Sequence, residues 1–131
     1  MTQNDKDLLL KDLCSRLPYG VKMNHIADNE VSPITLIGID RDYVILQGAG
    51  GYSYVPVEHY KPYLLPLSSM TEEQKNEWQS FMIQDAYGIL YHTIESYDYL
   101  NKNHFDYRGL IEKSLALNAT GLNIYIFIII N

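Results

Sequence analysis

The chain has 131 residues, 47% of them hydrophobic and 20% charged, which is ordinary for one globular domain that buries its own core. Ten lysines and arginines against sixteen acidic residues give a net charge of −6 without any basic cluster, which disfavours a conventional nucleic-acid binder. The N-terminus has acidic residues where a signal peptide carries basic ones. We therefore expect a cytoplasmic protein that binds no nucleic acid.

The first predicted element is a helix that begins at Asn4 or Asp5 and ends before Pro18 and Gly20. Its apolar residues recur at helical spacing, and they include the single cysteine, Cys14, which we place in the core. Alternation of apolar and polar residues then predicts antiparallel strands at 21–25, 34–39, 43–47 and 52–57. The turns between the last three contain residues 40–42 and the glycine-rich residues 48–51.

In the second half, Pro62 and Pro66 predict an extended path rather than a helix. A capping box, either Ser69 with Glu72 or Thr71 with Gln74, then predicts a helix whose inward face holds Trp78, Phe81 and Met82. A shorter helix is expected over residues 94–100, with Thr93 as its cap.

These elements predict an α+β fold with an N-terminal helix, a small antiparallel SH3-like sheet or barrel, and a helical C-terminal half. We expect a single domain over residues 1–131, in which 1–66 hold the first helix and the sheet, 67–117 the helical half, and 118–131 an apolar tail. One core is predicted to combine residues of the sheet with residues of the helices: Ile34, Leu36, Ile39, Val44, Leu46 and Val55 with Leu13, Leu17, Trp78 and Phe81.

No catalytic motif is present. Gly48, Gly50 and Ser53 approximate GxGxxG, and Gly51, Ser53 and Val55 approximate GxSxG, but each set lacks the last glycine and no helix is predicted to follow. His92 and Glu95 share a predicted helical face near His104 and Asp106, although four scattered histidines make such proximity common by chance. We therefore predict neither an enzyme, a cofactor nor a metal site.

The loop at 104–108 holds the candidate binding residues His104, Asp106, Tyr107 and Arg108. In a functional interpretation, Arg108 and Tyr107 clamp an anionic or planar partner while Asp106 orients the arginine. In a structural interpretation, Asp106 caps a turn at 107–111 and the apolar neighbours anchor the C-terminal segment. The structural interpretation is the favoured one.

Three blocks of the sequence, LLLKDLCSRLPYGVK at 8–22, KPYLLPLSSMTEEQ at 61–74 and NHFDYRGLIEKSLAL at 103–117, resemble a group of small proteins encoded in prophages and mobile elements of gut-dwelling bacteria. In that group the blocks read KDLCARLPYGV, IKPYLRPLSSMTEEE and HHFDYRGLI. The resemblance covers residues 8–117 and implies a bacterial or phage protein of the cytosol, without catalytic residues to carry over. Leu65 stands where the group tends to have arginine.

The tail, GLNIYIFIIIN at 121–131, lies beyond this resemblance and is too short to cross a bilayer, so we expect no association with a membrane. Its isoleucines and aromatics predict a strand over residues 124–130, either within the chain's own sheet or across a homodimer. The leading hypothesis for the function is a non-enzymatic interaction module that binds a protein partner through a tyrosine-rich sheet or loop surface. The alternative is a binder of a small anionic ligand, such as a nucleotide, through residues 104–108.

Overall fold

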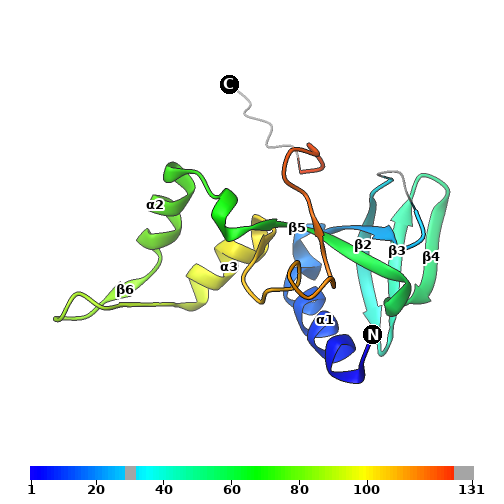
Figure 1. Ribbon diagram of the computed structural model, residues 1–131, viewed down its shortest axis with the longest axis horizontal. Coiled ribbons are helices and arrows are strands. Elements are labelled where there is room, and N and C mark those ends of the chain that lie inside the picture. The colour runs from blue at the N-terminus through cyan, green and yellow to red at the C-terminus, as the bar shows by residue number, and fades with distance from the viewer. Residues whose placement is uncertain (29–31, 126–131) are drawn as a thin grey trace.

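The computed structural model describes residues 1–28 and 32–125, and its main feature is a seven-stranded sheet (Figure 1). The strands lie in the order β4-β3-β2-β1-β5-β8, and β9 also pairs with β5. Their bounds are β1 Lys22–His25, β2 Ile34–Asp40, β3 Tyr43–Gly48, β4 Gly51–Pro56, β5 Tyr60–Pro66, β8 Phe105–Asp106 and β9 Leu117–Asn118. The helices are α1 Gln3–Arg16, α2 Glu72–Ser80 and α3 Ile94–Lys102.

The antiparallel part of the sheet confirms the predicted strands of the N-terminal half. Strands β2, β3 and β4 form a meander in which Tyr43 pairs with both Asp40 and Pro56. The turn between β3 and β4 ends at Gly51, whose φ of 114° is open to glycine but rarely to other residues. The residues after Pro56 continue as β5, which pairs with β1 and so joins the sheet.

The predicted fold class is wrong for the C-terminal half and for the closed barrel. Residues 67–117 hold only two α-helices, α2 and α3, of nine residues each, besides a short 3-10 helix at Leu67–Ser69. Between them lies a two-stranded hairpin, β6 (Ile83–Gln84) and β7 (Leu90–Tyr91). The strands β8 and β9 then add to β5 in parallel, which makes the sheet mixed rather than antiparallel. The spacing of Trp78, Phe81 and Met82 suggested a longer helix, but α2 stops at Ser80 because the chain turns there into the hairpin.

Helix α1 covers the sheet with a face that is only half apolar. Thr2 accepts a hydrogen bond from the Asp5 backbone while the Asp5 side chain accepts one from Thr2, so the cap lies two residues before the predicted one. The buried residues of the helix are Leu9, Asp12, Leu13 and Arg16. Cys14 is exposed, so its predicted place in the core is wrong: it lies beside this buried row rather than in it.

Two clusters of apolar side chains replace the single predicted core. The main cluster confirms the predicted residues of the sheet and of α1, since Leu13, Leu36, Val44 and Leu46 are buried in it and Leu17, Ile34, Ile39 and Val55 pack against it. The second cluster is formed by Tyr99, Leu100 and Phe105, with Trp78 packed against them. Trp78 is therefore in a different cluster from the one predicted, and Phe81 is 38% exposed.

The predicted C-terminal strand at 124–130 falls mostly outside the described residues, and its described part, Ile124 and Tyr125, belongs to no strand. Tyr125 instead folds back onto the sheet. Its hydroxyl donates to the Tyr63 carbonyl at 2.7 Å and accepts from the Lys22 amide at 2.8 Å.

Candidate functional site

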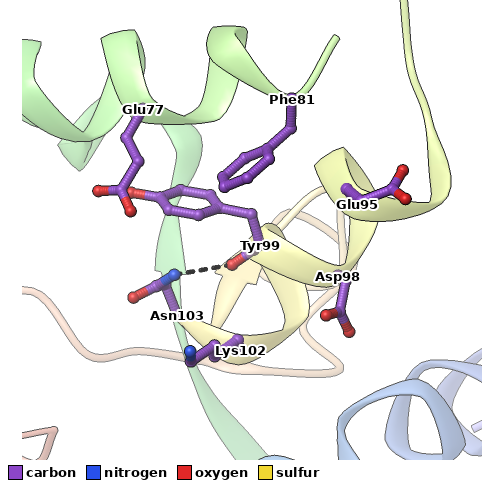
Figure 2. A pocket seen from close by; sticks show the side chains of 7 residues that line it. All are labelled: Glu77, Phe81, Glu95, Asp98, Tyr99, Lys102 and Asn103. Carbon is purple, nitrogen blue, oxygen red and sulfur yellow. Dashed lines mark hydrogen bonds between the residues drawn. The ribbon is translucent and has the colours of Figure 1, made fainter.

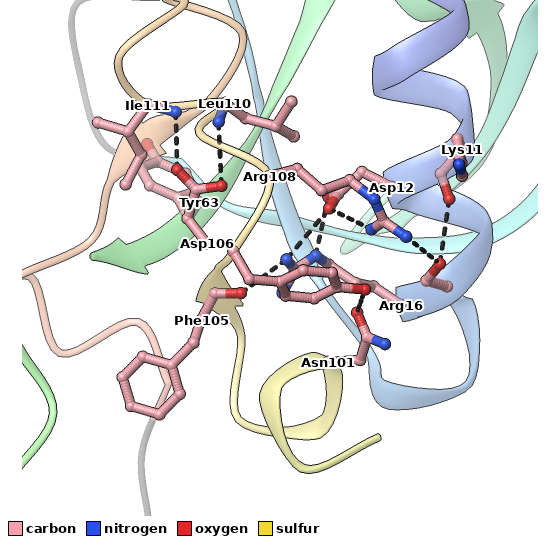
Figure 3. Close-up of polar contacts among 12 residues, drawn as sticks. Lys11, Asp12, Arg16, Tyr63, Asn101, Phe105, Asp106, Arg108, Leu110 and Ile111 are labelled. Carbon is pink, nitrogen blue, oxygen red and sulfur yellow. Dashed lines mark hydrogen bonds and ion pairs between the residues drawn. The ribbon is translucent and has the colours of Figure 1, made fainter. Parts of the chain in front are cut away.

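Asp12 joins the helix α1 to the loop that follows β8. Its carboxylate accepts from Arg16 Nε at 2.8 Å and from Arg16 Nη2 at 3.1 Å, and both side chains are fully buried. The same carboxylate accepts from Arg108 Nη1 at 2.8 Å, as Figure 3 shows. Arg16 also donates to the Phe105 carbonyl at 2.7 Å. One carboxylate therefore orients two arginines that come from different parts of the chain.

Tyr107 completes this group from the side of the loop. The guanidinium of Arg108 lies 4.6 Å from the centroid of the Tyr107 ring, and that of Arg16 lies 5.4 Å from it. The Tyr107 hydroxyl donates to the side chain of Asn101 at 3.0 Å. Arg108 and Tyr107 lie against each other, and Arg108 is bonded to α1. Their predicted role as a clamp on an anionic or planar partner stays a prediction.

Asp106 caps the turn that follows it, as the structural interpretation predicted. Its two oxygens accept from the backbone amides of Leu110 at 3.0 Å and Ile111 at 2.9 Å. Arg108 is oriented by Asp12 rather than by Asp106, and it also donates to the Ser15 hydroxyl at 3.1 Å. Asp12 is not among the residues predicted from the sequence, although its four-residue spacing to Arg16 within the leucine row of the helix is a signal for such a pair.

His104 has a different neighbour from the other three predicted residues. Its ring stacks on that of Tyr125 with centroids 3.7 Å apart, and only 7% of the residue is exposed. Burial, together with the positive charges of Arg16 and Lys22, lowers the pKa of His104 to about 4. The imidazole is therefore neutral at pH 7 and offers no positive charge to an anion.

A hollow of about 540 Å³ borders this loop, lined in part by Pro66, Asp106, Tyr107 and Glu112. None of the described residues that line it is a lysine or an arginine. The anionic-ligand site at 104–108 stays a prediction, and the contacts of the four side chains favour the structural interpretation instead.

A second feature is formed by the part of the chain between β5 and β8. Residues 71–98, here called the arm, comprise α2, the β6–β7 hairpin and the first part of α3, and Figure 1 shows the hairpin projecting from the rest of the molecule. Among the described residues sixteen large apolar side chains are exposed, and half of them belong to the arm. These eight are Phe81, Ile83, Tyr87, Ile89, Leu90, Tyr91, Ile94 and Tyr97.

The hairpin of the arm is ordered by its own polar contacts. Asp85 accepts from the backbone amides of Tyr87 at 2.9 Å and Ile89 at 3.0 Å, and from the Tyr91 hydroxyl at 2.9 Å. These bonds, with the one from Ile89 contributing most, lower the pKa of Asp85. At the base of the hairpin the Thr93 hydroxyl donates to the Phe81 carbonyl at 2.6 Å. The apolar side chains of the hairpin are thus presented to solvent by a fixed loop.

The arm is also acidic. Its six carboxylates against one lysine give it a net charge of −5, out of −6 for the whole chain. Three of these carboxylates, Glu77, Glu95 and Asp98, line a pocket of about 270 Å³ between α2 and α3. The rings of Phe81 and Tyr99 lie between them with centroids 5.8 Å apart (Figure 2).

The electrostatics of this pocket follow from burial and charge. Tyr99 is 8% exposed, and burial and the nearby charge of Glu77 both raise the pKa of its phenol. Asp98 accepts a hydrogen bond from the Tyr19 hydroxyl, which holds α3 to the 3-10 helix Leu17–Tyr19 that follows α1 and raises the pKa of Tyr19. Lys102 is the one basic side chain among the described residues that line the pocket.

No family model, no curated protein and no solved structure matches this chain. Within residues 1–28 and 32–125, no helix combines the length and the apolar character that crossing a membrane requires.

Proposed function

We propose that this protein is a non-enzymatic protein-interaction module of phage or mobile-element origin that acts in the cytoplasm, and that the arm is its binding surface. The observation that carries the proposal is the row of exposed apolar side chains on an ordered hairpin. Ile83, Tyr87 and Ile94 are 63%, 90% and 86% exposed. Apolar surface left in water costs roughly 25 cal/mol for each Å², so a partner that covers these side chains gains that free energy.

The tyrosine-rich face of the sheet supports the proposal less well. Tyr43 and Tyr54 stack on each other with centroids 4.8 Å apart, and the Tyr54 hydroxyl donates to Asp40 at 2.6 Å. Each of these two rings therefore already has an internal partner. The exposed side chains of the arm are more numerous and lie together in seventeen residues, 81–97.

The hairpin is held in one conformation by its own hydrogen bonds. This favours a binding surface over a segment that merely fails to pack against the core. A loop that must be ordered when a partner arrives loses part of the binding free energy to conformational entropy. The bonds of Asp85 fix the loop beforehand, and the antiparallel pairs Ile83 with Tyr91 and Gln84 with Leu90 fix its stem. An aromatic and aliphatic surface on such a rigid element is typical of the centre of a protein interface.

The test is a comparative capture from a bacterial lysate, with each retained protein identified by mass spectrometry, purified and titrated by calorimetry. The wild type is compared with Ile89→Ser/Leu90→Ser in the arm and with Tyr52→Ser on β4, where Tyr52 is 73% exposed. We expect a partner that binds the wild type and Tyr52→Ser but not the arm variant. The same set of partners, bound with the same affinity by all three proteins, would contradict the proposal.

A further inference from the structure

We propose that the partner of the arm presents a basic, amphipathic polypeptide segment that seats an arginine or lysine side chain in the pocket between α2 and α3. This inference rests on the proposed function and specifies the chemistry of the partner. It joins two properties of the same surface: the exposed apolar residues of the hairpin and the negative charge of the arm.

The negative charge of the arm indicates what kind of partner binds it. The arm has a net charge of −5, whereas all other residues of the chain together have −1. Two arms that met across a two-fold axis would bring like charges together, which disfavours a second copy of this arm as the occupant. An anionic membrane surface is disfavoured for the same reason. A basic segment with an apolar side matches both properties.

The pocket supplies the place where one cationic side chain is held. Glu77 comes from α2, and Glu95 and Asp98 come from α3, so carboxylates stand on both sides of the Phe81 and Tyr99 rings (Figure 2). A cation above an aromatic ring gains from the electrons of its face, and gains more where nearby carboxylates neutralise it. The volume of about 270 Å³ is below the range usual for drug-sized ligands, and it suits a single side chain.

The hairpin extends this contact along the arm. Phe81 belongs to the pocket and lies two residues before Ile83, where the first strand of the hairpin begins. A segment anchored in the pocket therefore meets exposed apolar side chains at once on leaving it. Its basic residues face the carboxylates of the pocket, and its apolar residues cover the hairpin.

For a substitution of Lys102, the inference predicts an effect on binding opposite to that of removing the carboxylates. This side chain lines the same pocket and is exposed, so its ammonium repels an incoming cation. Removing its charge should strengthen the binding of a basic segment, whereas removing Glu77 and Glu95 should weaken it. A pocket with only a structural role would show neither effect on binding.

The test uses a fluorescein-labelled peptide of sequence GLRRILRYLRRG and a matched peptide in which citrulline replaces every arginine, so that shape is kept and charge is lost. Binding is followed by fluorescence polarisation at two salt concentrations. We expect the wild type to bind the arginine peptide about tenfold more tightly than the citrulline peptide, with the difference shrinking at high salt. Glu77→Gln/Glu95→Gln should weaken binding about fivefold or more, and Lys102→Gln should strengthen it.

The control variant is Asp28→Asn/Glu112→Gln, which makes the same change in net charge at two exposed positions outside the arm. It should bind the arginine peptide nearly as the wild type does. Equal binding of both peptides, equal loss in the control and arm charge variants, or no saturable binding of the arginine peptide would overturn the inference. If Ile89→Ser/Leu90→Ser still lost its cellular partner in those cases, the proposed function would stand with a partner of different chemistry.

Discussion

Asp12 and Arg108 are separated by 96 positions in the chain and meet in an ion pair of 2.8 Å. The contact ties helix α1 to the loop after β8, and it uses the same carboxylate oxygen that accepts from Arg16. Because Arg16 is fully buried, the free energy of this contact depends on the carboxylate remaining charged and in place.

Asp12→Asn should therefore destabilise the fold by about 3–5 kcal/mol, since it leaves the charge of Arg16 buried without its counter-ion. The change is measured as the free energy of unfolding in urea. Asp7→Asn, an exposed position on the same helix, is the matched control and should cost about 0.5 kcal/mol or less. Equal effects of the two substitutions would show that Asp12 has no special role in stability.

His104 should make the fold sensitive to mild acid. Its pKa is about 4 in the folded state and about 6.5 in an unfolded chain, so between these values the unfolded state binds more protons. The stabilisation is complete above about pH 6.5 and is lost as the pH falls toward 4, by at most about 3 kcal/mol. Urea titrations at several pH values measure this slope.

His104→Asn is the comparison, because the backbone φ of 63° at this position is one that asparagine tolerates. The variant should show a flatter dependence of stability on pH between 6.5 and 4, whatever its stability at pH 7. Parallel curves for the two proteins would mean that the titration of His104 is not linked to folding.

Asp85→Ala should loosen the hairpin without unfolding the sheet, because the contacts of Asp85 all lie within the arm. Hydrogen exchange should become faster at the amides of Tyr87 and Ile89, while the melting temperature stays close to that of the wild type. Glu73→Ala, an exposed position on α2, is expected to leave exchange in the hairpin unchanged. Unchanged exchange in Asp85→Ala would argue against an ordered loop.

Tyr125→Phe should cost about 1–3 kcal/mol, since the Lys22 amide and the Tyr63 carbonyl lose their partner while the ring remains on His104. Truncation after Thr120 removes the ring as well and should lower the melting temperature further.

Truncation after Tyr125 keeps these contacts and tests residues 126–131 alone. The mass of this truncated protein is measured by light scattering. A change from dimer to monomer would support the predicted homodimer through the tail, and an unchanged mass would count against it.

Sequence patterns predicted the antiparallel strands because each strand of the meander carries its own alternation and its own turn residues. The cap Thr93 was also predicted, and Thr71 was one of the two caps predicted for α2, since a capping box is a local motif. The strands β8 and β9 have two residues each, which is too short for a periodic pattern. They exist because β5 offers them an edge, and such long-range pairing leaves no local signal.

The polar contacts of the candidate sites were harder to predict. Charged residues on a helix usually face solvent, so Asp12 and Arg16 were not placed inside, although they lie in the same row as Leu9 and Leu13. In the arm, the helical spacing of the apolar residues suggested a longer helix, although Asp85 and Gly88 are residues typical of turns. The structure shows that those turn residues define the hairpin, and with it the exposed surface.

The chain leaves the sheet at the end of β5 and re-enters it beside the same point, where Leu65 pairs with Phe105 and Pro66 with Asp106. The Leu65 amide also donates to the His104 carbonyl at 2.8 Å. The segment between these positions therefore begins and ends at neighbouring points of the sheet. Its length can change without shifting the register of the strands. Such an insertion can diversify in evolution, or be exchanged by an engineer, as long as Asp98 and Asn101 keep their bonds to Tyr19 and Tyr107 of the scaffold.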